Sequence, residues 1–180
     1  MTTVEETPDV TTQQPTTTER AAAGDAIIRN HALLAAGGGL IPVPGLDVAA
    51  VTGIQINMIR RLSELYGLPF EVQDVRTILS CVAATGLGKL VSYAVNSYTT
   101  LFEEFGSFSD NLTNGLVSGA ITFGTGEIIQ THFEHGGTMG DLDYMDFIDY
   151  YQEKIQSGDL VPQDIMQIEQ GIRSALTALK

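Results

Sequence analysis

A run of glycine and proline between two apolar segments, within residues 31–61, most constrains how this chain can fold. Residues 20–36 before it are rich in good helix formers. The glycines at 37–39 are expected to end that helix, because glycine adopts the left-handed cap conformation at little steric cost. The prolines at 42 and 44 fix their own φ and disfavour helix in the residue before each. The pattern predicts two helices joined by a sharp turn, with Asp47 as the N-cap of the second.

The turn itself combines backbone-shaping residues with large apolar side chains. We expect the turn to be built by Gly37, Gly38, Gly39, Pro42, Pro44, Gly45 and Asp47. The apolar side chains among them are Leu40, Ile41, Val43 and Leu46. Such a turn is either covered by the rest of the domain or exposed for a partner or a lipid surface. Both interpretations stay open, and these four residues are our candidates for partner or membrane contact.

The remainder of the chain also shows helical spacing of apolar residues, without an alternation typical of strands. Further helices are predicted at residues 72–105, 112–134, 144–157 and 162–180, and glycines at 86 and 88 leave open whether the first of these is one helix or two. We predict an all-α fold of about six helices. In two of them, periodicity puts Leu34 and Met145 on the inner faces.

Glycine is unusually frequent in the helix predicted at residues 112–134, where it occupies positions 115, 119, 124 and 126. Each costs roughly 0.8–1 kcal/mol against alanine in a helix interior. We therefore expect this helix to be held by packing and not by intrinsic propensity.

Composition separates a tail from a single folded domain. Residues 1–19 are mainly Thr, Gln, Glu and Pro, bury almost nothing, and are predicted to be a disordered tail before one helical domain at 20–180. The net charge of −13 argues against nucleic-acid binding and against electrostatic attraction to anionic lipid, since both require clustered Lys and Arg. Cys81 is the single cysteine, which excludes an intrachain disulfide, and it is expected to be a small buried apolar residue.

Membrane-spanning helices are not predicted, although 43% of the residues are hydrophobic. The uncharged runs are short, interrupted by proline, or rich in Ser, Thr, Asn and Gly, whereas a span needs about 20 mostly apolar residues. A hairpin embedded in the membrane stays open as an alternative. With no recognisable secretory leader, we expect a cytoplasmic protein, with peripheral contact to a membrane as an open alternative.

Few residues of the sequence are candidates for a catalytic or metal-binding site. His132 and His135 share one helical face at i, i+3, but the sequence offers no third metal ligand. Asp146, Asp149 and Glu153 are expected to form a solvated helix face, with an acidic patch for a basic partner as the alternative. We predict no enzyme activity, cofactor or metal; a small metal-binding enzyme using the two histidines is the further alternative.

Two segments resemble the bacterial YcjF-type family, which is catalogued mainly as a domain of unknown function. Residues 25–66, DAIIRNHALLAAGGGLIPVPGLDVAAVTGIQINMIRRLSELY, resemble its apolar helix, small-residue run, IPVPGLD-like turn and basic pair. Residues 122–143, TFGTGEIIQTHFEHGGTMGDLD, resemble its small-residue helix and acidic continuation. The resemblance implies a helical domain often associated with GTPases and membranes. The chain itself contains no P-loop motif.

These observations together predict a non-catalytic helical interaction module. Following the resemblance, we expect it to associate with itself and to act at or near a bacterial membrane or beside a GTPase.

Overall fold

The structure is a computed structural model that describes residues 16–43, 45–84 and 107–159, and within these ranges every element is a helix. The helices are α1 (Thr17–Gly38), α2 (Leu46–Tyr66), α3 (Val72–Ala84), α5 (Ser107–Glu134) and α6 (Tyr144–Ser157). The all-α prediction is confirmed for this part of the chain. The predicted helix at 162–180, the second half of the segment at 72–105 and most of the predicted tail lie outside the described residues.

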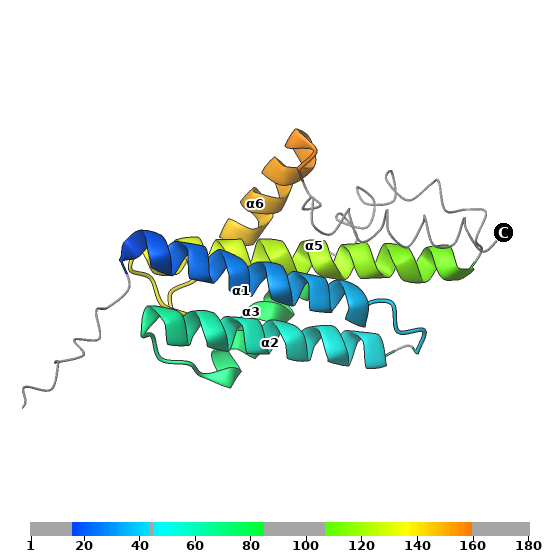
Figure 1. Cartoon of the computed structure of the whole chain (residues 1–180), viewed down its shortest axis with the longest axis horizontal. Helices are drawn as coiled ribbons and strands as arrows, with labels where there is room; N and C mark the ends of the chain where they lie inside the picture. Colours follow the sequence, from blue (N-terminus) through cyan, green and yellow to red (C-terminus); the bar gives the residue numbers. More distant parts are fainter. Residues whose placement is uncertain (1–15, 44, 85–106, 160–180) are drawn as a thin grey trace, which may run out of the picture.

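Three helices form the body of the molecule. α1, α2 and α5 lie alongside one another, and α1 runs opposite in direction to the other two (Figure 1). α3 packs against α2, while α6 crosses at a steep angle and contacts α5 and α3 (Figure 1). The largest fully buried side chains come from every described helix, and they are Ile28, Met58, Ile59, Leu62, Val75, Ile129, Phe147 and Tyr151. A single core thus connects all five helices.

Two helices begin earlier than expected. α1 starts at Thr17, inside the predicted tail, because Thr16 and Glu19 form a reciprocal capping box. The Thr16 backbone N–H donates to Glu19 at 2.9 Å and the Thr16 hydroxyl accepts from the Glu19 N–H at 3.3 Å. α5 starts at Ser107, where a loop at 106–111 was expected. Ser, Asp and Asn favour helix N-termini as well as loops, so composition alone does not separate the two.

The glycine run at 37–39 does not end α1 in the predicted way. Gly37 and Gly38 lie within the helix, and Gly39 is its C-cap with an ordinary right-handed φ of −69°. The left-handed glycine of this turn is Gly45, with φ 89°. Asp47 is not the N-cap of α2 either: Gly45 holds that position, and the Asp47 carboxylate accepts from the Gly45 N–H at 2.8 Å.

Gly39 allows the backbones of α1 and α5 to touch. A Cβ at Gly39 would lie 2.7 Å from the Asn114 carbonyl oxygen and 2.9 Å from the Gly115 Cα. A Cβ at Gly115 would in turn lie 2.7 Å from the Ala36 carbonyl oxygen. Because backbone atoms cannot move aside as a flexible side chain can, neither position has room for a larger residue. The prediction that packing holds the glycine-rich helix is therefore confirmed at this contact.

Three side chains are less buried than predicted. Leu34 and Met145 are exposed, at 59% and 43%, although both were expected to face inward. α1 instead buries mainly small residues, including Ala32 and Ala35, and α6 buries Phe147. Cys81 is half-buried and not fully buried. A close contact between helix backbones excludes a leucine from the face that α1 turns toward α5.

We predict that Gly39→Ala lowers the free energy of unfolding by about 1–3 kcal/mol, because the new methyl group must displace backbone atoms of α5. The measurement is equilibrium denaturation by urea. Gly53→Ala is the matched control, because Gly53 lies inside α2 and a methyl group added there would have nothing within 4 Å. That substitution should raise stability by about 0.5–1 kcal/mol. Equal effects of the two substitutions would contradict the backbone contact.

Candidate functional site: an exposed apolar turn

The four apolar residues of the α1–α2 turn divide into two pairs. Leu40 and Ile41 are half-buried, and Leu40 covers α5 at Gly115, where a Cβ would lie 3.0 Å from its Cδ2. Val43 and Leu46 are 50% and 54% exposed. In the structure, the turn is thus partly core and partly surface.

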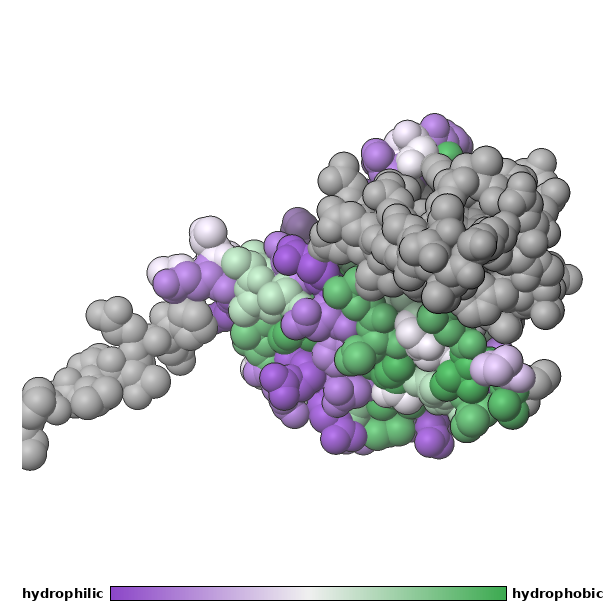
Figure 2. All heavy atoms as spheres, turned by 45° about the vertical axis from the view of Figure 1, so that its right-hand side comes forward, coloured by the Kyte–Doolittle hydropathy of each residue, from purple (hydrophilic) through white to green (hydrophobic). Residues whose placement is uncertain are grey.

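Val48, a residue that the sequence did not single out, extends the exposed part into the first turn of α2. It is 65% exposed. The face of the molecule drawn in Figure 2 carries apolar patches beside hydrophilic ones. We call Val43, Leu46 and Val48 the apolar tip. Its position in the sequence could have indicated this exposure, because Val48 directly follows the turn and precedes the buried residues of α2.

Most backbone N–H groups of the turn donate hydrogen bonds to acceptors within the turn or in α1. The N–H groups of Leu40 and Ile41 donate to carbonyls of α1, and those of Leu46 and Asp47 donate to the Val43 carbonyl. The prolines at 42 and 44 contribute no N–H group. An apolar environment penalises unpaired backbone groups, so this arrangement lowers the cost of moving the turn out of water.

Charge is nearly absent from the turn. Asp47 is the one ionisable residue between positions 32 and 59. Its carboxylate is occupied by the hydrogen bond from Gly45. The apolar tip therefore offers no cation to a lipid phosphate, and its contacts would be made by apolar surface.

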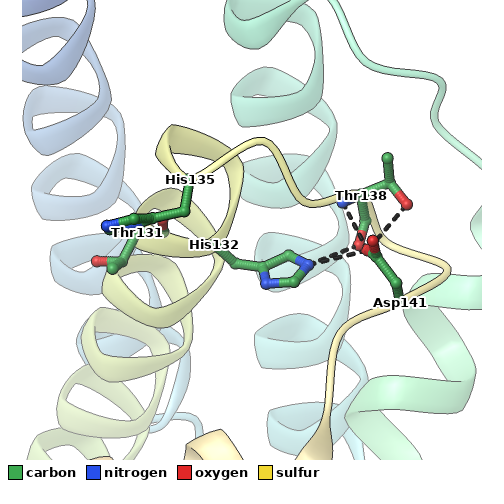
Figure 3. Close-up of polar contacts among 5 residues, drawn as sticks. All are labelled: Thr131, His132, His135, Thr138 and Asp141. Carbon is green, nitrogen blue, oxygen red and sulfur yellow. Dashed lines mark hydrogen bonds and ion pairs between the residues drawn. The ribbon is translucent and has the colours of Figure 1, made fainter.

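The two histidines proposed as metal ligands do not converge. His132 Nε2 lies 3.0 Å from Asp141 Oδ1 and 3.1 Å from the Thr138 carbonyl oxygen, whereas His135 Nδ1 lies 2.7 Å from the Thr131 carbonyl oxygen (Figure 3). Because Nε2 of His132 faces two acceptors, it carries the proton. Within the described ranges, no group of three or more His, Cys, Asp and Glu side chains is placed to hold a metal ion. The His132 contacts hold the loop between α5 and α6, whereas the His135 contact returns to Thr131 of α5.

Asp141 is the centre of this loop contact. Its carboxylate accepts from His132, from the Thr138 N–H at 2.6 Å and from the Thr138 hydroxyl at 3.0 Å. The hydrogen bond from His132, followed by those from Thr138, lowers the pKa of Asp141 to about 2 from its ordinary 3.8. These bonds favour the ionised carboxylate.

The acidic residues of α6 lie at the surface as expected. Asp146, Asp149 and Glu153 are exposed and lie around a hollow between α5 and α6. Tyr150, at its edge, donates to Glu127 at 2.8 Å. Burial, and then the Glu127 carboxylate, raises the pKa of Tyr150 well above its ordinary value, which keeps the phenol protonated as a donor. This surface is solvated and strongly negative.

We predict that Asp141→Asn lowers the thermal midpoint at neutral pH, and that its difference from wild type shrinks as the pH falls toward about 2. A carboxylate with a lowered folded pKa stabilises the fold above its ordinary pKa and loses that effect as pH falls through the folded pKa. Thermal unfolding of both proteins across this range measures the difference. Asp149→Asn, which removes an exposed carboxylate of α6, is the control. A wild-type advantage that persists unchanged at pH 2 would refute this role.

None of the described helices is both long enough and apolar enough to cross a bilayer.

A family model described as "Domain of unknown function (DUF697)" matches residues 9–157. The chain is 32% identical over 133 residues to magnetosome membrane protein 22 of Magnetospirillum gryphiswaldense, a match that covers 73% of this chain and 68% of the relative. No solved structure matches the chain.

Proposed function

The chain belongs to the DUF697 family, which is the YcjF-like, GTPase-associated family, and from that membership we propose that it is a non-catalytic module that contacts a membrane surface through its apolar tip. The observation that carries the proposal is the exposure of Val43, Leu46 and Val48 on a turn whose backbone is largely paired. The name of the relative in Magnetospirillum, a membrane protein, agrees with this setting.

Contact with lipid would rest on apolar insertion and not on charge. The chain carries a net charge of −13, and the turn contains one acidic residue and no basic one. Anionic headgroups therefore repel the protein, although salt screens that repulsion. Neutral or zwitterionic lipid is accordingly the favoured surface.

A single apolar tip would bind weakly. Full burial of a Val or Leu side chain contributes about 1.5–3 kcal/mol, and the tip residues are already about half covered. Insertion of all three would give roughly 3–4 kcal/mol, which corresponds to a dissociation constant near the millimolar range. Self-association would present several tips to one membrane and raise the effective affinity. We therefore include a homo-oligomer in the proposal.

A GTPase is the proposed protein partner, on the ground of the family's association with GTPases. The exposed acidic side chains of α6 offer a surface for a basic region of such a partner. The proposed location is cytoplasmic, at the face of the inner membrane.

We predict that Val43→Asp and Leu46→Asp each reduce binding to phosphatidylcholine vesicles at least about tenfold, because insertion would have to desolvate a carboxylate. Co-flotation with vesicles is the measurement. Both side chains are about half exposed, so the substitutions should leave the fold intact.

Met145→Asp is the matched control, since Met145 is an exposed apolar residue on α6, away from the turn. It should bind like wild type. Wild-type protein that fails to float, or tip variants that float as well as Met145→Asp, would rule out this contact.

A further inference from the structure

An uncharged helix surface lies along the side of the α1–α2 pair, on the outside of the seam between the two helices. The seam is marked at the surface by His31 and Asn57, whose Nε2 and Nδ2 atoms lie 3.1 Å apart. Leu34 follows His31 by three residues and is 59% exposed, and Gly53, four residues before Asn57, is exposed as well. Because residues three or four apart lie on one side of a helix, these four residues share a surface. We call them the seam face.

Leu34 points outward because the residues around it supply the contacts between helices. Ala35 is 0% exposed and faces the core. A Cβ at Gly38 would lie 3.5 Å from Ile54 Cδ1, so Gly38 faces α2. The surface at Gly53 is open by contrast, since a Cβ there would have nothing within 4 Å. The seam face therefore combines a raised apolar side chain with a position that lacks a side chain.

The four residues of the seam face carry no charge, although the net charge of the chain is −13. The chain has 22 acidic and 9 basic residues, yet Asp47 is the one ionisable residue between positions 32 and 59. The His31 imidazole is neutral, because Nδ1 donates to the Ile27 carbonyl at 2.7 Å and Nε2 accepts from the Asn57 amide. The exposed side of a surface helix ordinarily carries charged residues. An apolar centre with few charges and a polar rim is instead typical of protein–protein interfaces.

A second copy of the chain fits this face better than lipid does. Two acidic copies repel each other over most of their surfaces, and they avoid like charges where charge is absent. The Asn57 amide keeps one N–H group and its carbonyl oxygen for a further partner. A protein surface can supply that partner, whereas an unpaired amide in hydrocarbon is costly. The turn lies at the end of the α1–α2 pair and the seam face along its side, so pairing there leaves the apolar tip free (Figure 1).

We infer that two copies associate through the seam face about a two-fold axis, so that Leu34 of each copy lies against Gly53 of the other. A two-fold contact pairs the same surface of both copies, which suits a face with both a raised and an open position. The inference rests on the homo-oligomer of the proposed function and names its interface. A stable interface has roughly 20–30 residues a side, so this smaller face should give a weak dimer, with a dissociation constant in the micromolar range or above. Two tips on one membrane would strengthen it.

The first test measures association of the whole chain by sedimentation equilibrium, without lipid, from micromolar to millimolar concentration. Wild type should form dimers at the upper end. Leu34→Glu and Leu34→Lys should each weaken the dimer at least about tenfold, because both would bury an ion at its centre. An effect of net charge alone would instead make Leu34→Lys associate more tightly than wild type. Tighter association of Leu34→Lys, or unchanged association of both variants, overturns the inference.

Met145→Glu and Met145→Lys are the matched controls for these charges. Met145 is an exposed apolar residue of α6, outside the seam face. Both control variants should associate like wild type. If they weaken the dimer as much as the Leu34 variants do, the seam face is not the interface.

The second test is Gly53→Leu, which separates a fitted contact from general apolar attraction. The single chain has room for this side chain, since a Cβ at position 53 would have nothing within 4 Å, and thermal unfolding checks that the variant folds. In the dimer the new side chain should collide with Leu34 of the other copy and weaken association at least about tenfold. Added apolar surface without a fitted partner would strengthen association instead, and that result overturns the inference.

The third test locates the contact directly by cross-linking. A short bismaleimide should join Leu34→Cys in a Cys81→Ser background into dimers, whereas Met145→Cys in the same background should stay uncoupled. If wild type dimerises but position 34 does not cross-link, the inference is wrong and the homo-oligomer of the proposed function stands. If wild type stays monomeric both in solution and on vesicles, the homo-oligomer is wrong as well, and co-flotation still tests the apolar tip separately.

Discussion

Backbone contact between the end of α1 and α5 is the constraint on which the rest of the structure depends. It exists because Gly39 and Gly115 meet without side chains. Further along the same pair of helices, a Cβ at Gly126 would lie 2.7 Å from Ile28 Cγ1, so the close approach continues into the core. Helices this close bury alanine and glycine between them and leave larger residues such as Leu34 outside. The chain leaves the contact at Leu40, and Val43 and Leu46, later in the turn, are the apolar side chains that remain exposed.

The sequence predicted the positions of the helices better than it predicted the role of each glycine. Helical periodicity located α2, α6 and the start of α3 well, and Gly158 ends α6 in the left-handed conformation. The glycines at 37–39 were predicted as a cap because a cap is a local property that composition can indicate. Gly39 serves a contact with Asn114 and Gly115, and that contact depends on a partner more than seventy residues away. No local pattern distinguishes these two uses of glycine.

Local sequence patterns also located the candidate site, but they did not indicate which of its side chains are exposed. The turn between residues 40 and 46 stood out because proline and glycine bracket apolar residues there. Its division into half-buried Leu40 and exposed Val43 depends on how the turn meets α5, and periodicity carries no such information. Val48 was missed because a valine at the start of an amphipathic helix is ordinary in sequence.

Contact between an acidic protein and lipid through the uncharged apolar tip is the central claim. The most direct measurement places an environment-sensitive fluorophore on Val43→Cys in a Cys81→Ser background, with Met145→Cys as the reference site on α6. On phosphatidylcholine vesicles, the label at position 43 should shift to the blue and become shielded from an aqueous quencher, at low and high salt alike, while the label at position 145 should stay unchanged. A label at 43 that remains open to the quencher on vesicle-bound protein would contradict the claim.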